Sequence, residues 1–435
     1  MAGLVFALLG GCGGGDGGRA AGQPYRLTVW FHAGQAPERR VMHAAVRRFN
    51  AVQHAVRVHL VLIPEGSYNG QVQAAALAGD LPDVLEFDGP YVSNYVWEGK
   101  LIPLDGLLPR RLLRGLLPSI VRQGTYRGRL YSVAMFDSGL GLWGNRRELE
   151  RAGVRIPATP RAAWSATRFD RVLAALARNN PDGKVLDLKL NYPGEWLTYA
   201  FSPLIESAGG DLLDRRTERT AQGFLNGPGA VFAMEQVQSW FRKGYVDPNL
   251  DGAAFTGGRV ALAWGGHWNY PRYHRALGRD LVLMPLPRFG PRLVTDSGSW
   301  NWGITIACRH PRLAARFLEF LLRPRQILAM TEANGAVPAT RAALARSPLY
   351  RPGGPLRLFA LQLEEGYAKP RPRTPAYPVI SSAFQQAFRV IRNGANVRVA
   401  LDRAVTTIDR DLRDNDGYPP IAVVRSRRRT AAGAR

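Results

Sequence analysis

Two acidic side chains, Glu86 and Asp88, stand at the end of the segment 83–87, whose apolar residues predict a strand. Such a pair can serve as the acid and nucleophile of a glycosidase, or can accept hydrogen bonds from a ligand rich in hydroxyls. Strand alternation puts both carboxylates on one face of the strand at a fixed spacing, and in that arrangement they would not flank a glycosidic bond well. Hydrogen bonding is therefore the favoured role, with Asp88 and Tyr91 as the first candidates. The competing interpretation is that Asp88 caps the following helix.

Signals for catalysis or metal binding are weak. The chain has no Gly-x-Ser-x-Gly, His-Glu-x-x-His or Walker sequence. Of its seven histidines, only His54 and His59 are close in sequence, and they straddle a predicted turn and strand. We therefore predict no enzymatic activity, no metal and no cofactor.

A different chemistry is indicated at Cys12, the last residue of Leu9-Gly10-Gly11-Cys12. An apolar run at 4–9 precedes this tetrapeptide and a glycine-rich stretch follows it, as in a bacterial lipoprotein signal whose thiol carries diacylglycerol. We predict a signal over residues 1–12 and a flexible tether over 13–24. The segment before the apolar run carries no Lys or Arg, so we expect the true start to lie upstream. The alternative is a glycine-rich N-terminus with an ordinary cysteine.

The composition is strongly basic, with a net charge of +24 over 435 residues. The basic residues are 53 Arg and only five Lys, and they are scattered along the chain, which is typical of codon bias. A nucleic-acid site would concentrate them on one element, so we predict no nucleic-acid partner. A surface near anionic head groups accounts for the charge. Residues 416–435 are expected to form a basic, disordered tail.

The elements that must position the acidic pair alternate from the start of the folded part. Residues 25–31, 56–63 and 83–87 have strand signals, and helical signals at 38–52 and 68–78 separate them. This order predicts a parallel sheet with helices on its faces, hence an α/β fold. Further strands are expected at 130–136, 260–264, 281–286 and 303–308.

Several segments in this order resemble one family. AAALAGDLPDV at 74–84, YRGRLYSV at 126–133 and GRVAL at 258–262 with Gly266-His267-Trp268 are similar to motifs of extracellular solute-binding proteins of ABC importers. The resemblance is to the sugar-binding branch that includes maltose-binding proteins, and it covers about residues 25–412.

The resemblance implies a periplasmic-binding-protein fold of the class II type, with two discontinuous lobes joined by a hinge. We expect residues 25–135 with 283–325 to form the N-terminal lobe, and 136–282 with 326–415 to form the C-terminal lobe. The chain would cross between them near 133–141, 279–286 and 323–336.

A carbohydrate offers hydroxyls that donate and accept hydrogen bonds, and C–H faces that lie against aromatic rings. The candidates that the resemblance and these residue types imply are Asp88, Tyr91, Phe87, Trp268, Trp264, Glu195, Trp196, Tyr199, Trp300, Asn301, His32, Gln35, Tyr68, Asp137 and Phe384, with Trp30 beside them. For each, packing in the core is the alternative.

The function implied is that of a monomeric lipoprotein on the outer face of a bacterial membrane. It would capture a carbohydrate, a di- or oligosaccharide, between the lobes and deliver it to the transmembrane subunits of an ABC permease. One alternative is a non-sugar ligand such as a glycerophosphodiester or a polyol. Another is a surface sensor or interaction protein without a transport partner.

Overall fold

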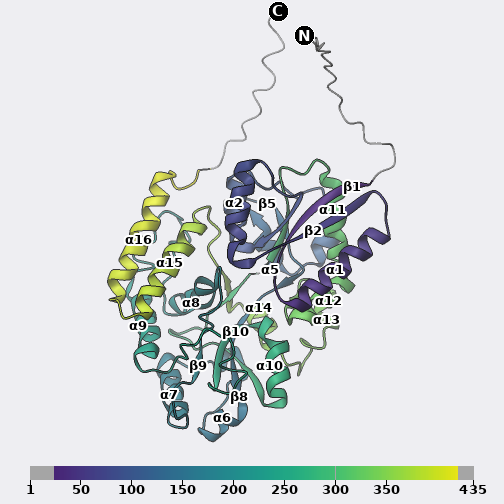
Figure 1. The fold of residues 1–435 in the computed structure, drawn as a ribbon. Coiled ribbons are helices and arrows are strands. Elements are labelled where there is room, and N and C mark those ends of the chain that lie inside the picture. Colours follow the sequence, from purple (N-terminus) through teal and green to yellow (C-terminus); the bar gives the residue numbers. More distant parts are fainter. Residues whose placement is uncertain (1–23, 299, 420–435) are drawn as a thin grey trace, which may run out of the picture.

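The computed structural model describes residues 24–298 and 300–419. Cys12 and the predicted signal lie outside these residues, as do 13–23 of the predicted tether and 420–435 of the predicted tail. Two separate sheets, each with its own helices, form two lobes; in Figure 1 the sheet with β1 and β2 lies above the sheet with β8 and β10. The expected two-lobe α/β fold is therefore confirmed.

The N-terminal lobe is built on a five-stranded sheet in the order β2-β1-β3-β13-β6. The first three of these strands are parallel, and β13 is antiparallel to both of its neighbours. The strands are β1 (Tyr25–His32), β2 (Val56–Ile63), β3 (Val84–Asp88), β6 (Ser132–Val133) and β13 (Trp300–Ile304). The helices of this lobe are α1 (Ala36–Ala51), α2 (Tyr68–Ala78), α3 (Val92–Trp97), α4 (Arg110–Gly115), α5 (Pro118–Gly124), α11 (Pro311–Leu321), α12 (Pro324–Asn334) and α13 (Arg341–Arg346).

The core of this lobe follows from strand alternation. Leu27, Val29 and Phe31 of β1 are buried on one face of the sheet, in the same cluster as Phe49 of α1. The ring of Phe49 lies 5.2 Å from that of Phe317 on α11, centroid to centroid. Helices α1, α11 and α12 therefore cover this face, and residues of α2 and α3 pack on the other (Figure 1).

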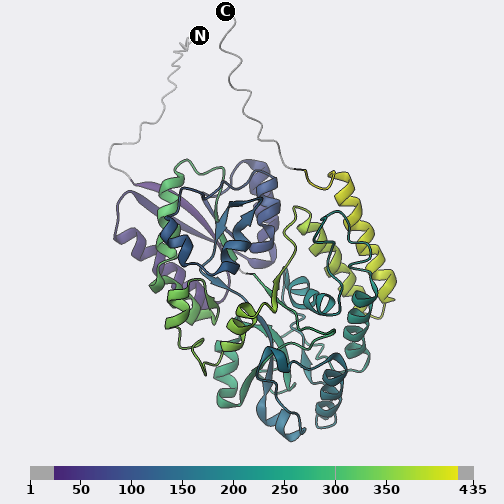
Figure 2. The same ribbon diagram turned by 180° about the vertical axis from the view of Figure 1, so that it is seen from behind.

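The C-terminal lobe has a four-stranded sheet in the order β11-β8-β10-β9. Its strands are β8 (Leu140–Asn145), β9 (Leu186–Asp187), β10 (Leu262–Gly266) and β11 (Leu281–Met284). Its helices are α6 (Arg146–Arg151), α7 (Ala166–Ala177), α8 (Trp196–Ser207), α9 (Pro228–Arg242), α10 (Tyr270–Leu277), α14 (Arg357–Glu364), α15 (Tyr377–Arg392) and α16 (Val397–Asp414). From both sides, α15 and α16 lie beside α8 and α9 (Figures 1 and 2).

Short strand pairs lie outside the two sheets. β7 (Phe136–Asp137) pairs with β14 (Val337–Pro338), and β12 (Thr295–Ser297) pairs with β15 (Ala368–Pro370). A third pair joins β4 (Thr125–Tyr126) to β5 (Arg129–Leu130). The first crossing between lobes lies between β6 and β8, inside the predicted range 133–141.

Two predicted lobe boundaries differ from the structure. Residues 283–297 were expected in the N-terminal lobe, but β11 extends the C-terminal sheet, and Leu286 and Phe289 pack in its core. The chain returns to the N-terminal lobe only at β13. Residues 326–343 were expected in the C-terminal lobe, but Ile327 and Met330 of α12 pack in the N-terminal core. The later crossings therefore lie between β12 and β13 and after α13.

Candidate functional site

A cavity of about 260 Å³ lies between the two lobes. The N-terminal lobe lines it with His32, Gly34, Gln35, Glu38, Glu65, Asp88 and Trp300. The C-terminal lobe lines it with Tyr192, Pro193, Glu195, Trp196, Tyr199, His267, Trp268 and Arg371, and Phe136, Ser138 and Gly298 come from the connections between lobes. Both lobes therefore contribute hydrogen-bonding and aromatic groups to one space.

Many of the predicted residues meet at this cavity, although they are far apart in the sequence. Those in its wall are His32, Gln35, Asp88, Glu195, Trp196, Tyr199, Trp268 and Trp300. The others, which the structure does not place in its wall, are Tyr91, Phe87, Asn301, Trp264, Tyr68, Asp137, Phe384 and Trp30.

Strand alternation explains why two of the predicted residues lie elsewhere. Asp88 and Trp300 are opposite each other in the pairing of β3 with β13, and they share the cavity side of the sheet. Phe87 pairs with Asn301 one position further along, so both point to the other face. Phe87 packs there against the ring of Tyr95, 5.3 Å away.

Two further predicted residues belong to the core of the C-terminal lobe. Trp264 and Phe384 are fully buried in one hydrophobic cluster. The indole N–H of Trp264 donates to the carbonyl of Ala200 at 3.1 Å, so its polar atom is satisfied within the protein. Trp30 is half-buried and packs at the edge of a cluster in the N-terminal lobe.

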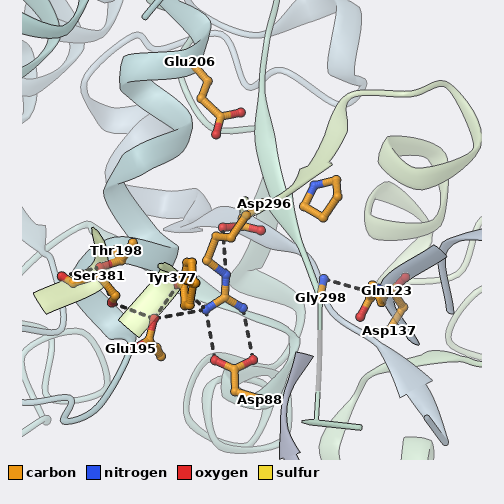
Figure 3. Close-up of polar contacts among 12 residues, drawn as sticks. Asp88, Gln123, Asp137, Glu195, Thr198, Glu206, Asp296, Gly298, Tyr377 and Ser381 are labelled. Carbon is orange, nitrogen blue, oxygen red and sulfur yellow. Dashed lines mark hydrogen bonds and ion pairs between the residues drawn. The ribbon is translucent and has the colours of Figure 1, made fainter. Parts of the chain in front are cut away.

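Three predicted residues support the cavity from behind. The hydroxyl of Tyr68 donates to the backbone carbonyl of Glu86. Tyr91 donates to Oε1 of Glu195 at 2.7 Å. Asp137 is fully buried and accepts hydrogen bonds from the side chain of Gln123 and the backbone N–H of Gly298, at 3.0 and 3.1 Å (Figure 3). Asp137 therefore ties the connections between lobes together.

The cavity wall contains a buried guanidinium, that of Arg371, which our sequence analysis missed. Its guanidinium binds the carboxylate of Asp88 with two contacts of 3.0 and 3.1 Å. Nη1 lies 3.6 Å from Glu195, and Nε lies 3.4 Å from Asp296 on β12. These three carboxylates point toward one centre, which the guanidinium occupies (Figure 3). Arg371 is 3% exposed, so the cluster is a buried ion network that joins the lobes.

Glu195 stands at the start of α8 and is held by hydroxyl donors as well as by Arg371. Tyr377 and Ser381 donate to its Oε2 at 2.5 and 2.8 Å, and Tyr91 donates to the other oxygen. Burial and the charge of Asp88 raise the pKa of Glu195, and Arg371 and the two tyrosine hydroxyls oppose the rise. The carboxylate is thereby fixed in one orientation.

The end of β1 places a charged imidazole against an indole. Nδ1 of His32 lies 2.6 Å from a carboxylate oxygen of Glu86, and the imidazole stacks on Trp300 with centroids 4.0 Å apart. Burial would lower the pKa of His32, but Glu86 outweighs this effect, so that the pKa rises to about 9. His32 is therefore protonated at neutral pH, and it fixes the Trp300 ring as one platform of the cavity.

The second indole platform, Trp268, comes from the loop after β10. Its ring lies against Gly266, where a Cβ would approach ring carbons to between 2.1 and 2.6 Å, so only glycine fits. The rings of Trp196 and Tyr199 each lie 6.0 Å from it. Gln35, at the N-cap of α1, donates to the carbonyl of Trp268 at 2.8 Å across the lobes.

Other wall residues were also missed, although each follows a turn or loop signal. They are Glu38, Glu65, Tyr192 and Arg371, while His267 was noted only as a neighbour of Trp268. Burial lowers the pKa of His267 to about 4, so its imidazole is neutral at neutral pH. Among the described residues, no group of three or more His, Cys, Asp and Glu could hold a metal ion.

The sequence profile of the bacterial extracellular solute-binding proteins matches residues 33–327. The chain belongs to this family. A lipoprotein of Streptomyces antibioticus is 26% identical to this solute-binding protein over 351 residues, which are 78% of this chain and 76% of the relative. The maltodextrin-binding protein of Bacillus subtilis is 23% identical over 296 residues, 65% of this chain and 67% of that protein.

A solved structure shares the fold of this solute-binding protein. The cyclic alpha-maltosyl-1,6-maltose binding protein of Arthrobacter globiformis superposes with a TM-score of 0.72 at 23% identity, over 90% of this chain and 100% of that one. No helix in the described part of the chain is long and apolar enough to span a membrane.

Proposed function

We propose that this protein captures a di- or oligosaccharide in the cavity between its lobes and delivers it to an ABC permease. It would do so outside the cytoplasm, anchored to the membrane by lipid on Cys12, and it would act as a monomer without catalysis. A hinge would bring the lobes together around the sugar, because a ligand that contacts both lobes favours the arrangement in which both are near.

The observation that carries this proposal is the pairing of two indole platforms with fixed carboxylates. Trp268 and Trp300 come from different lobes and both line the cavity, as do Asp88 and Glu195. Aromatic faces suit the C–H surfaces of a sugar ring, and carboxylates accept hydrogen bonds from its hydroxyls.

The known relatives support the same reading. One is a maltodextrin-binding protein, and the solved structure with this fold binds a cyclic maltosyl-maltose. The Streptomyces relative is a lipoprotein, which supports the anchor predicted at Cys12.

The cavity suits an anionic ligand such as a glycerophosphodiester less well. Arg371 already contacts three carboxylates, and His32 is paired with Glu86. A phosphate would therefore have to displace an existing partner from either cation. The net positive charge of the chain therefore does not indicate an anionic ligand, because the cations at this cavity are already paired with carboxylates.

Calorimetric titration of the protein from Gln23 onward against neutral di- and oligosaccharides tests the proposal. We expect one class to bind and Trp268→Ala to weaken that binding by about 5- to 30-fold, because the variant removes roughly 1–2 kcal/mol of ring contact. Trp97→Ala is the matched control, since Trp97 is half-buried but lies outside the cavity wall. Binding that is unchanged in Trp268→Ala, or no binding of any saccharide, would contradict the proposal.

A further inference from the structure

The positive charges at the cavity are already engaged by protein carboxylates. Arg371 is shared among Asp88, Glu195 and Asp296, and His32 is paired with Glu86. His267 is neutral, because burial lowers its pKa. Among the described residues of the wall, no cationic side chain is left without a carboxylate partner.

Two acidic side chains of the wall, in contrast, have no cationic partner within ion-pair distance among the described residues. Both oxygens of Glu38 accept from neutral donors, the backbone N–H of Gln35 at 2.7 Å and the amide of Asn334 at 2.9 Å. These bonds orient the carboxylate, and the only cation among the described residues of the wall that acts on it, His32, lies beyond ion-pair distance and is itself paired with Glu86. Carboxylates therefore outnumber cations in the wall of the cavity.

Glu65 is the second of these and the more accessible. It lies in the loop between β2 and α2, is exposed, and lines the cavity. No described residue forms a hydrogen bond or ion pair with its carboxylate. Its loop meets the other lobe, since a Cβ on Gly66 would lie 3.3 Å from Pro193. Glu65 therefore stands where the two lobes meet, and its carboxylate has room for a ligand. Burial and the nearby carboxylates of Glu38 and Asp88 raise its pKa, and the charge of His32 opposes the rise.

A hydroxyl on the opposite lobe independently points to a ligand. Tyr199 is 6% exposed and lines the cavity; its Oη lies near the hydroxyl of Ser138 but has no partner of good hydrogen-bond geometry among the described residues. Its ring lies 4.7 Å from the guanidinium carbon of Arg371, which holds the phenol in place. A buried hydroxyl without a partner is costly, and a sugar hydroxyl in the cavity would satisfy it.

We infer that this cavity prefers a saccharide that carries a protonated amine, with the amine bound by Glu65 and a ring hydroxyl bound by Tyr199. The inference rests on the proposed function and specifies the class of sugar. A neutral sugar can donate hydroxyls to Glu65, but only a cation relieves the negative charge that Glu38 and Glu65 leave at this wall.

Matched pairs of saccharides test the inference. The probes are maltose against 6′-amino-6′-deoxymaltose, and N,N′-diacetylchitobiose against the glucosamine dimer, titrated calorimetrically at pH 6.5 and low salt. We expect the amine of at least one pair to bind about tenfold more tightly than its neutral partner, and the preference to shrink as salt is added.

Glu65→Gln should abolish the preference while retaining the affinity for the neutral sugar. Glu332→Gln should leave both unchanged, because Glu332 is an exposed carboxylate of the same lobe that does not line the cavity. Neutral sugars that bind as tightly as their amines would overturn the inference and leave the proposed function standing. A preference that survives in Glu65→Gln overturns the role of Glu65, and a lack of binding to every probe overturns both proposals.

Discussion

The two walls of the cavity differ in chemistry. The N-terminal lobe contributes mainly charged side chains, His32, Glu38, Glu65 and Asp88. The C-terminal lobe contributes mainly aromatic rings, those of Tyr192, Trp196, Tyr199 and Trp268. We therefore expect the N-terminal lobe to select a ligand by its polar groups, and the C-terminal lobe to provide most of the apolar contact area.

The origin of the difference lies in the elements that carry each wall. His32 and Asp88 end parallel strands of one sheet, and ligands bind at that edge in open α/β sheets. The aromatic wall comes from the start of α8 and the loop after β10. The exceptions are Arg371 and Glu195, which are charged but line the aromatic wall, and Trp300, which is aromatic but lines the charged wall. The predictions below test these links between the walls.

The largest expected effect comes from removing Arg371, the cation that joins the walls. In Arg371→Met, three buried or partly buried carboxylates lose their shared partner. We expect the free energy of unfolding to fall by about 3–5 kcal/mol, measured by urea denaturation.

The matched control is Arg373→Met, two residues along the same loop. Arg373 is exposed and donates only to backbone carbonyls, so its loss should change stability by no more than about 0.5 kcal/mol. Adding Asp88→Asn to Arg371→Met should recover part of the stability, because one of the unpaired charges is removed. Equal effects of the two arginine variants would show that the network does not join the walls.

The next effect concerns the charged wall alone. Because the pKa of His32 is about 9 in the folded state and about 6.5 when unfolded, the folded protein binds the extra proton between these values. Its contribution is fully present below pH 6.5 and is lost as the pH rises through 9, by about 3 kcal/mol in total. Urea denaturation at pH 6 and pH 9.5 measures this loss.

A variant isolates the contribution of His32 from those of other titrating groups. His32→Gln should lose about 3 kcal/mol less than the wild type between the two pH values. His54→Gln, which replaces an exposed histidine of the same lobe, should behave like the wild type. If both variants follow the wild type, His32 does not carry a raised pKa.

Local patterns predicted the elements of the charged wall well. The alternation at 56–63 and the helical signal at 68–78 correspond to β2 and α2 residue for residue, and the edge where Asp88 stands follows from the β-α-β order. Alternation also separates Asp88 from Phe87, although it does not say which face is the cavity.

The aromatic wall and its cation could be predicted less well, for physical reasons. Trp264 and Trp268 lie four residues apart in one glycine-rich segment, and only the packing of β10 sends one to the core and the other to the cavity. Arg371 follows Lys369-Pro370 in a loop without periodicity, among 53 arginines, and its three partners come from distant segments. Long-range convergence of this kind leaves no local signal.

The smallest expected effect comes from Gln35, whose amide bonds the carbonyl of Trp268 across the lobes. This bond forms only when the walls are together, so under the proposed hinge mechanism its loss should weaken saccharide binding by about 0.5–1.5 kcal/mol. Gln35 also caps α1, and Gln35→Ala removes both interactions. Gln35→Glu keeps an acceptor for the cap but has no donor for Trp268. Calorimetric titration of both variants should therefore show weaker binding in each. A loss confined to Gln35→Ala would assign the effect to the helix cap, and the two walls would then be held together by the Arg371 network without help from Gln35.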